Sequence, residues 1–149
     1  MIRSDQEYQA ALTRMKQDEQ VAVQQRTALE AAALTPEEVE RAMQPLLAFH
    51  AQLAEEVTWY ERIKRRDFGV ISRLTALGRL LIALRIAGGI TQRELAQRLG
   101  VDESQVSRDE RNEYYGITLE RAQRVLDALG ASVITRVVEQ AEERELVPA

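Results

Sequence analysis

The sequence predicts an all-α protein with an N-terminal long helical hairpin, like a coiled-coil arm, followed by a C-terminal bundle of short helices. Ala, Leu, Glu, Gln and Arg dominate the 149 residues, and these residues lose little side-chain freedom in helices. Aromatic residues make up only 5% of the chain, which has 7 Gly and 3 Pro. Helix start signals recur along the chain, first far apart and then closely spaced.

Residues 1–68 predict two long helices that form the arm. Ser4-Asp5-Gln6-Glu7 is a capping box that starts a helix running to about Ala33, with Tyr8, Leu12 and Met15 on one face. Thr35-Pro36-Glu37-Glu38 starts the second helix. Its seam residues recur in steps of four and three, as in a heptad repeat: Val39, Met43, Leu46, His50, Leu53, Val57, Tyr60 and Lys64.

Pro45 lies within this second helix and is expected to bend it or to split off its first turns. His50 is interpreted as a polar residue that the seam tolerates. We expect the two helices to pair as an antiparallel hairpin, which either dimerises or folds back on the rest of the chain.

Residues 69–130 predict four short helices, each bounded by a capping residue or a glycine. They cover about Ser72 to Ala87, Thr91 to Gly100, Asp102 to Arg111 and Thr118 to Leu129. Residues 131–149 follow as a C-terminal strand or helix and a tail. The β-branched run 131–138 favours a short edge strand, although its valine spacing also suits a helix. Residues 142–149 are expected to fray.

The composition excludes several classes of site. The chain has no cysteine and one histidine, so we expect no disulfide, no metal site and no cofactor. No catalytic arrangement of side chains stands out, and an enzyme is not expected. No apolar run reaches the roughly 18 residues that a membrane span needs, and the first residues lack the apolar core of a secretory signal. We therefore expect a cytoplasmic protein with no membrane partner.

Charge is distributed unevenly along the chain. The net charge of −4 by itself argues against nucleic acid, but residues 73–126 carry nine arginines and seven acidic residues. The segments on either side, 1–72 and 127–149, each have a balance of −3. Because salt screens fields beyond about 10 Å, local charge decides docking on phosphates. The central segment is therefore the candidate for contact with nucleic acid.

Residues 89–108 have the spacing of a helix-turn-helix. Two helices that cross steeply need a small residue where they approach, which Ala96 supplies, and a turn residue that tolerates positive φ, which Gly100 supplies. Apolar contacts would hold the pair rigid, from Leu95, Leu99, Val101 and Val106. The outer face of the second helix is small or polar, as a surface that reads a DNA groove must be.

The run Thr91-Gln92, Leu95-Ala96-x-x-Leu99-Gly100-Val101 and Val106-Ser107-Arg108-x-Glu110 resembles the Cro/cI-type (XRE) helix-turn-helix family of transcriptional regulators. The resemblance covers about Leu77 to Leu129. It implies a lambda-repressor-like bundle that binds double-stranded DNA. The leading hypothesis is therefore a homodimeric regulator, with repression favoured over activation, in which the N-terminal helices hold two subunits together on a pseudo-palindromic operator, associated with the nucleoid when bound to DNA.

The resemblance also implies roles for individual residues. Gln92 and Arg93 would contact phosphate, and the second helix would present the residues that enter the major groove: Glu103, Ser104, Gln105, Ser107 and Arg108. Arg108 is the best candidate for a bidentate contact to guanine. Arg85 and Glu110 match a family pair that forms a structural salt bridge.

Three features depart from the family pattern. Asp109 stands at a position that is usually apolar, so the second helix is expected to end or tilt differently. Asn112 replaces the usual glycine after this helix and also tolerates the left-handed region. Tyr114 and Tyr115 either bind phosphate or pack on the next helix, and we favour packing.

Two other functions remain open at this stage. The long helical arm on a small repressor-like bundle also fits a HigA-like antitoxin, which binds DNA and a protein toxin. A helical adaptor or structural protein, in which the arm is the working part, is the further alternative.

Overall fold

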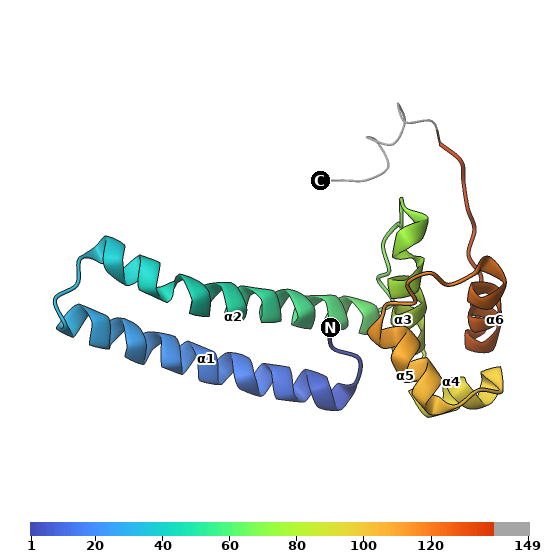
Figure 1. The fold of residues 1–149 in the computed structure, drawn as a ribbon, viewed down its shortest axis with the longest axis horizontal. Helices are drawn as coiled ribbons and strands as arrows, with labels where there is room; N and C mark the ends of the chain where they lie inside the picture. Colours follow the sequence, from blue (N-terminus) through green and yellow to red (C-terminus); the bar gives the residue numbers. More distant parts are fainter. Residues whose placement is uncertain (139–149) are drawn as a thin grey trace. The chain divides into compact units, whose positions relative to one another are not determined.

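The computed structural model describes residues 1–138, and the all-α prediction is confirmed for them. The elements, in order, are α1 (Asp5–Ala31), α2 (Pro36–Lys64), the 3₁₀ turn η1 (Leu74–Ala76), α3 (Leu77–Ala87), α4 (Gln92–Leu99), α5 (Glu103–Arg111) and α6 (Leu119–Leu129) (Figure 1). The chain divides into two compact units, residues 1–64 and the residues from 65 onward. Each unit is described by itself.

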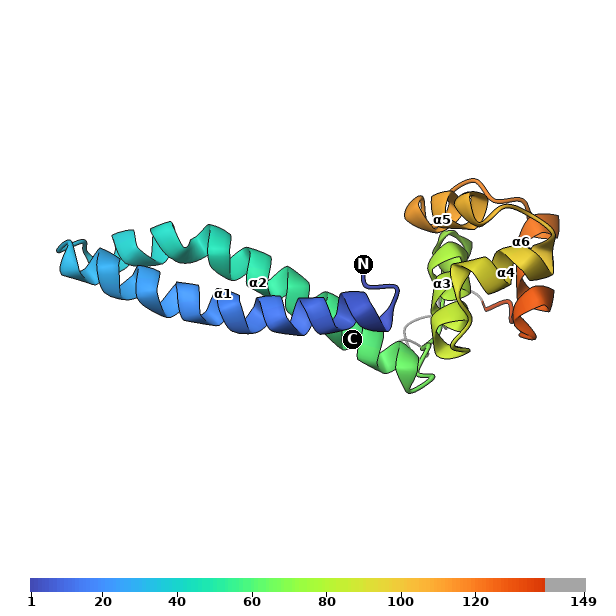
Figure 2. The same cartoon turned by 90° about the horizontal axis from the view of Figure 1, so that it is seen from below.

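In the first unit, α1 and α2 form the predicted antiparallel hairpin and lie side by side in both views (Figures 1 and 2). Ion pairs fix its register at both ends. Near the chain start, the Lys64 Nζ lies 3.3 Å from the Asp5 Oδ1. Near the turn between the helices, the Arg26 Nη1 lies 2.5 Å from the Glu40 Oε1. Because the two pairs lie far apart along the helices, a shift in register would break both.

The predicted seam is the buried face of α2 at both of its ends. Val39 and Met43 are buried on one side of Pro45, and Val57 and Tyr60 on the other. Of the two outcomes expected at Pro45, a bend or a split, the split is excluded, because α2 continues through this residue. Proline removes one backbone N–H and therefore one helical hydrogen bond, while packing continues on both sides of that gap.

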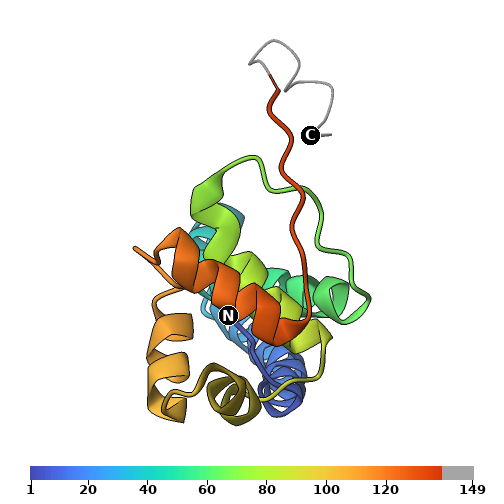
Figure 3. The ribbon, with the colours of Figure 1, turned by 90° about the vertical axis from the view of Figure 1, so that its right-hand side faces the viewer.

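The second unit has its core between α3 and the three helices that follow it. Its most deeply buried apolar side chains are each at most 1% exposed: Leu81, Ile82, Leu95, Val106 and Val125. Helix α4 packs against α5 and α6, and α6 also packs against α3. Figure 3 shows α6 lying along α3, with α4 and α5 together at one edge of the unit.

Two predictions about the ends of this unit differ from the structure. The helix expected from Ser72 begins as the η1 turn, and α-helical geometry starts only at Leu77. The predicted strand at 131–138 is wrong, because these residues form neither strand nor helix. A strand needs a neighbouring strand for its backbone hydrogen bonds, and residues 1–138 contain none. The fraying predicted for 142–149 lies outside the described residues.

No single helix among the described residues is both long and apolar enough to cross a membrane, and α3 and α4 meet that condition only as a pair bent by 109°.

Candidate nucleic-acid interface

The first helix of the motif, α4, begins and ends where the sequence predicts. At its start, the Glu94 N–H donates to the Thr91 Oγ1 at 3.1 Å, and the Thr91 N–H donates to the Glu94 carboxylate at 2.7 Å. The Thr91 backbone N–H is the main reason why the pKa of Glu94 lies below its usual value. At its end, Gly100 adopts φ 67° and ψ 35°. The left-handed turn predicted for this glycine is therefore confirmed.

The contact between α4 and α5 is also built as the motif requires. Ala96 is 2% exposed, so the two helices approach closely at this small residue. The Val101 N–H donates to the Ala96 carbonyl at 3.0 Å and closes the turn. Leu99 and Val101 are half-buried beside this contact. The start of α5 at Glu103 follows Asp102, whose side chain makes no capping hydrogen bond.

A buried polar network ties both helices of the motif to α3. The Arg85 guanidinium donates to both carboxylate oxygens of Glu110, at 2.7 Å for the Nη2–Oε2 pair, and to the Ile90 carbonyl at 2.8 Å. Glu110 is completely buried. The Gln92 amide adds a third donor, at 2.7 Å from the Glu110 Oε2. The network joins the start of α4 and the end of α5 to one guanidinium, and this fixes the position of α5.

The outward face of α5 presents part of the predicted DNA-binding set. Glu103, Ser104 and Arg108 are exposed, and Ser107 is half-buried. Arg108 has no ion pair or hydrogen-bond partner for its guanidinium within residues 1–138. Its five N–H donors are therefore available to an acceptor outside the protein.

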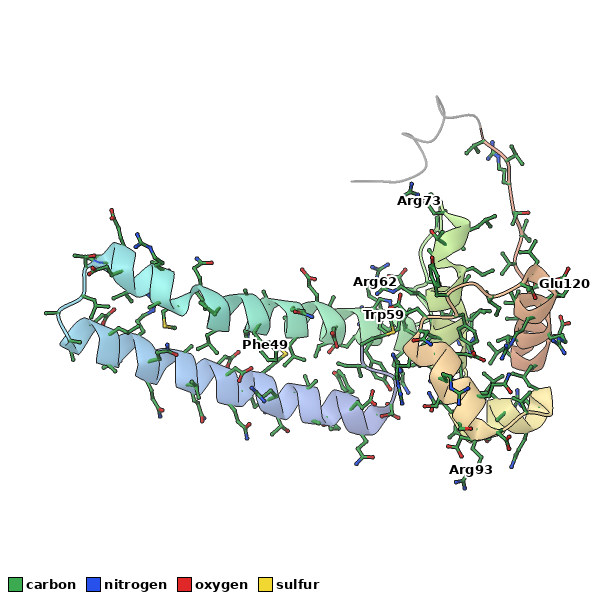
Figure 4. The ribbon with its side chains drawn as sticks, in the orientation of Figure 1. Phe49, Trp59, Arg62, Arg73, Arg93 and Glu120 are labelled. Atoms are coloured by element: carbon green, nitrogen blue, oxygen red, sulfur yellow. The ribbon has the colours of Figure 1, made fainter. Side chains whose placement is uncertain are left out.

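The remaining predicted residues lie around this face. Arg93 projects outward from α4 (Figure 4), and its Nε lies 3.1 Å from the Glu103 Oε2. Gln92 is half-buried over Glu110. Gln105 is half-buried and lines a cavity of about 120 Å³ with Arg121 and other side chains. The structure thus brings Arg93 to the outward face and turns Gln105 toward α6.

The residues after α5 differ from two expectations: the left-handed turn does not lie at Asn112, and only one of the two tyrosines packs. Asn112 does not take the left-handed conformation (φ −92°). Glu113 and Tyr114 take it instead, at φ 50° and 54°. The Tyr114 N–H donates to the Asp109 carbonyl at 2.7 Å, five residues back along the chain. This turn is wider than an α-helical turn, so the chain changes direction after Asn112 and not at it. Tyr114 is buried, as the packing interpretation predicts, whereas Tyr115 is 95% exposed and does not pack.

Two features of this region could not be read from local sequence. Asp109, at its unusual position, forms an ion pair with Arg121 of α6, so α5 continues as a regular helix to Arg111. Gly78 of α3 touches the loop after α5 so closely that a Cβ atom would stand 1.9 Å from the Glu113 carbonyl oxygen. Both contacts join segments that are distant in the chain, and only the presence of a glycine in α3 hinted at the second.

Comparison with known proteins places a helix-turn-helix in the same part of the chain as the α4–α5 motif described above. Residues 81–134 match a family model described as helix-turn-helix. The match starts within α3 and includes all of α4, α5 and α6. No curated protein and no solved structure matches the chain.

Proposed function

From the Cro/cI-type (XRE) helix-turn-helix domain at residues 81–134, we infer that this DNA-binding transcription regulator is a repressor that binds a pseudo-palindromic operator as a homodimer. Each subunit places α5 in the major groove of one half-site, as such motifs do. The protein acts in the cytoplasm, at the nucleoid. The operator blocks transcription when it is occupied.

The observation that carries this proposal is the outward face of α5 with its unpartnered guanidinium. Arg108 lies exposed near the C-terminal end of α5, where Glu110, two residues further on, is held in the buried network. A rigid helix positions the fork of Arg108 so that it reaches O6 and N7 of one guanine. Ser104, one turn earlier on the same face, is placed for a neighbouring base or phosphate. Ser107 lies between them, half-buried.

The phosphate contacts come from the start of α4. The Gln92 Nε2 carries two hydrogens and donates one of them to Glu110, so the other remains for a phosphate oxygen. Arg93 is exposed beside it. The carboxylate of Glu103, which Arg93 neutralises in the free protein, accepts from a cytosine N4 in the groove. Gln105 supports the face from the side of α6.

The arm supplies the homodimer contact. Two helices leave part of the hairpin's inner face uncovered, and several apolar side chains on α1 and α2 are only half-buried: Leu12, Met15, Leu46 and Leu53. A second hairpin covers these side chains and gives a four-helix bundle. The seam also contains the buried His50 Nδ1 and Asp18 Oδ2, which have no hydrogen-bond partner within residues 1–138.

Selection of bound duplexes from a random DNA pool tests the proposal. We expect two inverted half-sites, with centres about 10 bp or a multiple of 10 bp apart. Arg108→Ala should weaken binding to this site by about 1–3 kcal/mol and relax one base position in each half-site. Arg136→Ala is the matched control, because Arg136 is an exposed arginine outside the helices. Unchanged binding of the Arg108 variant to every duplex would refute the assigned face.

A HigA-like antitoxin is the second candidate, and the arm favours it. The arm is a compact unit separate from the DNA-binding unit, and it exposes apolar side chains at Val21, Val23 and Phe49. These are separate exposed apolar side chains, of which Phe49 is the largest that a protein partner would cover. Stable co-purification with the product of an adjacent small gene, lost when Phe49 is replaced by Glu, would support this candidate.

A further inference from the structure

Two polar side chains meet in the middle of the arm, within a seam that is mostly apolar. Asp18 is the central residue of α1, and His50 is the central residue of α2. They lie at the same level of the hairpin, because Glu19, next to Asp18, has its Oε1 4.0 Å from the His50 Nε2. We call the Asp18 and His50 side chains the polar layer. Phe49, which precedes His50, marks the middle of the arm in Figure 4.

Each side chain of the polar layer has one atom beside a charged neighbour and one atom without a partner. The Arg14 Nε donates to the Asp18 Oδ1 at 2.8 Å, and Glu19 faces the His50 Nε2. The other two atoms, the Asp18 Oδ2 and the His50 Nδ1, are buried and have no hydrogen-bond partner within residues 1–138. Asp18 as a whole is 5% exposed. Leaving both atoms unsatisfied costs free energy, so the polar layer is suited to a further group that binds both.

A metal cation would satisfy both atoms at once. Carboxylate oxygen and neutral imidazole nitrogen are ligands of Zn²⁺, and such ligands are commonly oriented through their other atom by a neighbouring polar group. Arg14 and Glu19 occupy those outer positions. A tetrahedral site needs four ligands, whereas the part of the chain that the structure describes contains no group of three or more. With one histidine in the chain, a second imidazole can come only from a second copy.

We propose that two arms pack with their polar layers together and bind one Zn²⁺ ion through Asp18 and His50 of both copies. This inference rests on the homodimer of the proposed function. A two-fold axis brings the central residues of both helices to the same level, whether the two hairpins run parallel or antiparallel. The His50 side chain is 27% exposed, so the polar layer is open to the outside of a single hairpin.

Charge favours a divalent cation in this position. The two Asp18 carboxylates carry two negative charges, which a divalent ion neutralises, while the Arg14 side chain is 58% exposed and is therefore solvated. Helical bundles hold metal ions in this way, between carboxylate and histidine side chains of facing helices. Because the ion joins two copies, it stabilises the dimer that binds paired half-sites. Affinity for the operator therefore depends on the supply of a divalent transition metal.

The test uses Co²⁺ as the probe, because tetrahedral Co²⁺ absorbs visible light far more strongly than the octahedral ion. Full-length protein is freed of metal with a chelator and titrated with Co²⁺, and then with Zn²⁺. We expect strong absorption that saturates at one Co²⁺ for two chains and disappears as Zn²⁺ displaces the cobalt. Weak octahedral absorption, or saturation at one ion for each chain, would overturn the proposal.

Four variants identify the ligands. His50→Gln and Asp18→Asn should each abolish the strong absorption, because each removes two of the four ligands and keeps a polar side chain. Glu19→Gln should keep the absorption and lower the affinity for Co²⁺ by about 10- to 100-fold, the usual effect of losing an outer partner. Glu55→Gln removes an exposed carboxylate from α2 and is the matched control, which should change neither value. Strong absorption in the His50 or the Asp18 variant would overturn the assigned ligands.

Circular dichroism of the metal-free variants checks that the arm stays helical. We expect unchanged helical content, because both ligand variants keep side chains of similar size. In operator binding, a chelator should weaken the affinity of the wild type for paired half-sites by about 5- to 150-fold, the usual range of such coupling. Zn²⁺ should restore the affinity of the wild type, whereas His50→Gln should respond to neither addition. Operator binding by the wild type that ignores both additions would overturn the regulatory role of the ion.

The result is separable from the proposed function, because Co²⁺ binding is measured without DNA. If the protein is a dimer that selects an operator but shows no tetrahedral Co²⁺, only the metal site is refuted. If the protein binds Co²⁺ as expected but prefers no DNA sequence, the proposed function fails and the metal site stands.

Discussion

Replacing Arg85 by methionine should destabilise the DNA-binding unit strongly, because it leaves the carboxylate of Glu110 buried without its cation. Glu110 is fully buried and accepts two hydrogen bonds from Arg85 and one from Gln92. Only the neutral Gln92 amide remains in the variant. Breaking a buried ion pair by removing one partner costs about 3–5 kcal/mol. Loss of the hydrogen bond to the Ile90 carbonyl is expected to add about 1 kcal/mol.

The double variant Arg85→Met/Glu110→Met separates the orphaned charge from lost packing. Apolar residues of similar volume can replace a buried ion pair at little cost. We therefore expect the double variant to lie within about 2 kcal/mol of the wild type, the remaining loss coming from the Gln92 amide and the Ile90 carbonyl.

Amide hydrogen exchange read by peptide is the appropriate assay. Peptides from α3 and α5 report the free energy of opening of the DNA-binding unit, and peptides from α1 and α2 serve as the internal control, because the arm is a separate compact unit. A cost below 1 kcal/mol for Arg85→Met would refute the reasoning. A double variant as unstable as the sum of both single variants would refute it as well.

Three further predictions concern local geometry and pH. Gly78→Ala should cost about 3 kcal/mol or more because its Cβ meets a backbone oxygen at 1.9 Å. Gly116→Ala, at φ 73° with open space around the Cβ, should cost only about 1–2 kcal/mol in the same denaturation experiment. The Thr91 cap lowers the pKa of Glu94 in the folded protein. The Glu94 carboxylate therefore contributes to stability above about pH 4.5, and this contribution is lost as the pH falls through the folded-state pKa of Glu94. Glu94→Gln should remove this acid dependence. Burial raises the pKa of Tyr114 above its usual 10.0, so the stability of the DNA-binding unit should fall as the pH rises past 10, and Tyr114→Phe should reduce that fall in melts at pH 9 to 12.

The boundaries of most helices follow from the sequence because they depend on bonds between near neighbours. The Ser4 and Thr91 side chains accept from backbone N–H groups three residues ahead, and Thr118 does the same for α6. Gly100 and Gly130 end their helices in the left-handed region, which glycine adopts without steric cost. These interactions span a few residues, so a single sequence contains all their participants.

The recognition face on α5 was predicted only in part, because some of its contacts join residues that are distant in the sequence. Helical periodicity places Arg108 and Ser104 on one face of α5, and the structure exposes both. Periodicity does not show that Gln105 lines a cavity with Arg121, because that depends on how α6 packs. Nor does it show that Gln92 donates to Glu110, a contact that requires α4 and α5 to be placed first.

The sequence by itself determined the helical class, the hairpin and the helix-turn-helix, while the Arg85–Glu110 pair was expected only from the family resemblance. Only the tertiary structure decided how α5 ends, since the left-handed turn moved from Asn112 to Glu113 and Tyr114. It also decided that residues 131–138 form no strand. A β-branched run favours extended backbone, but a strand exists only where another strand supplies its hydrogen bonds. Local backbone preferences depend on neighbouring residues and can be predicted from the sequence, whereas contacts between distant residues depend on how the helices pack.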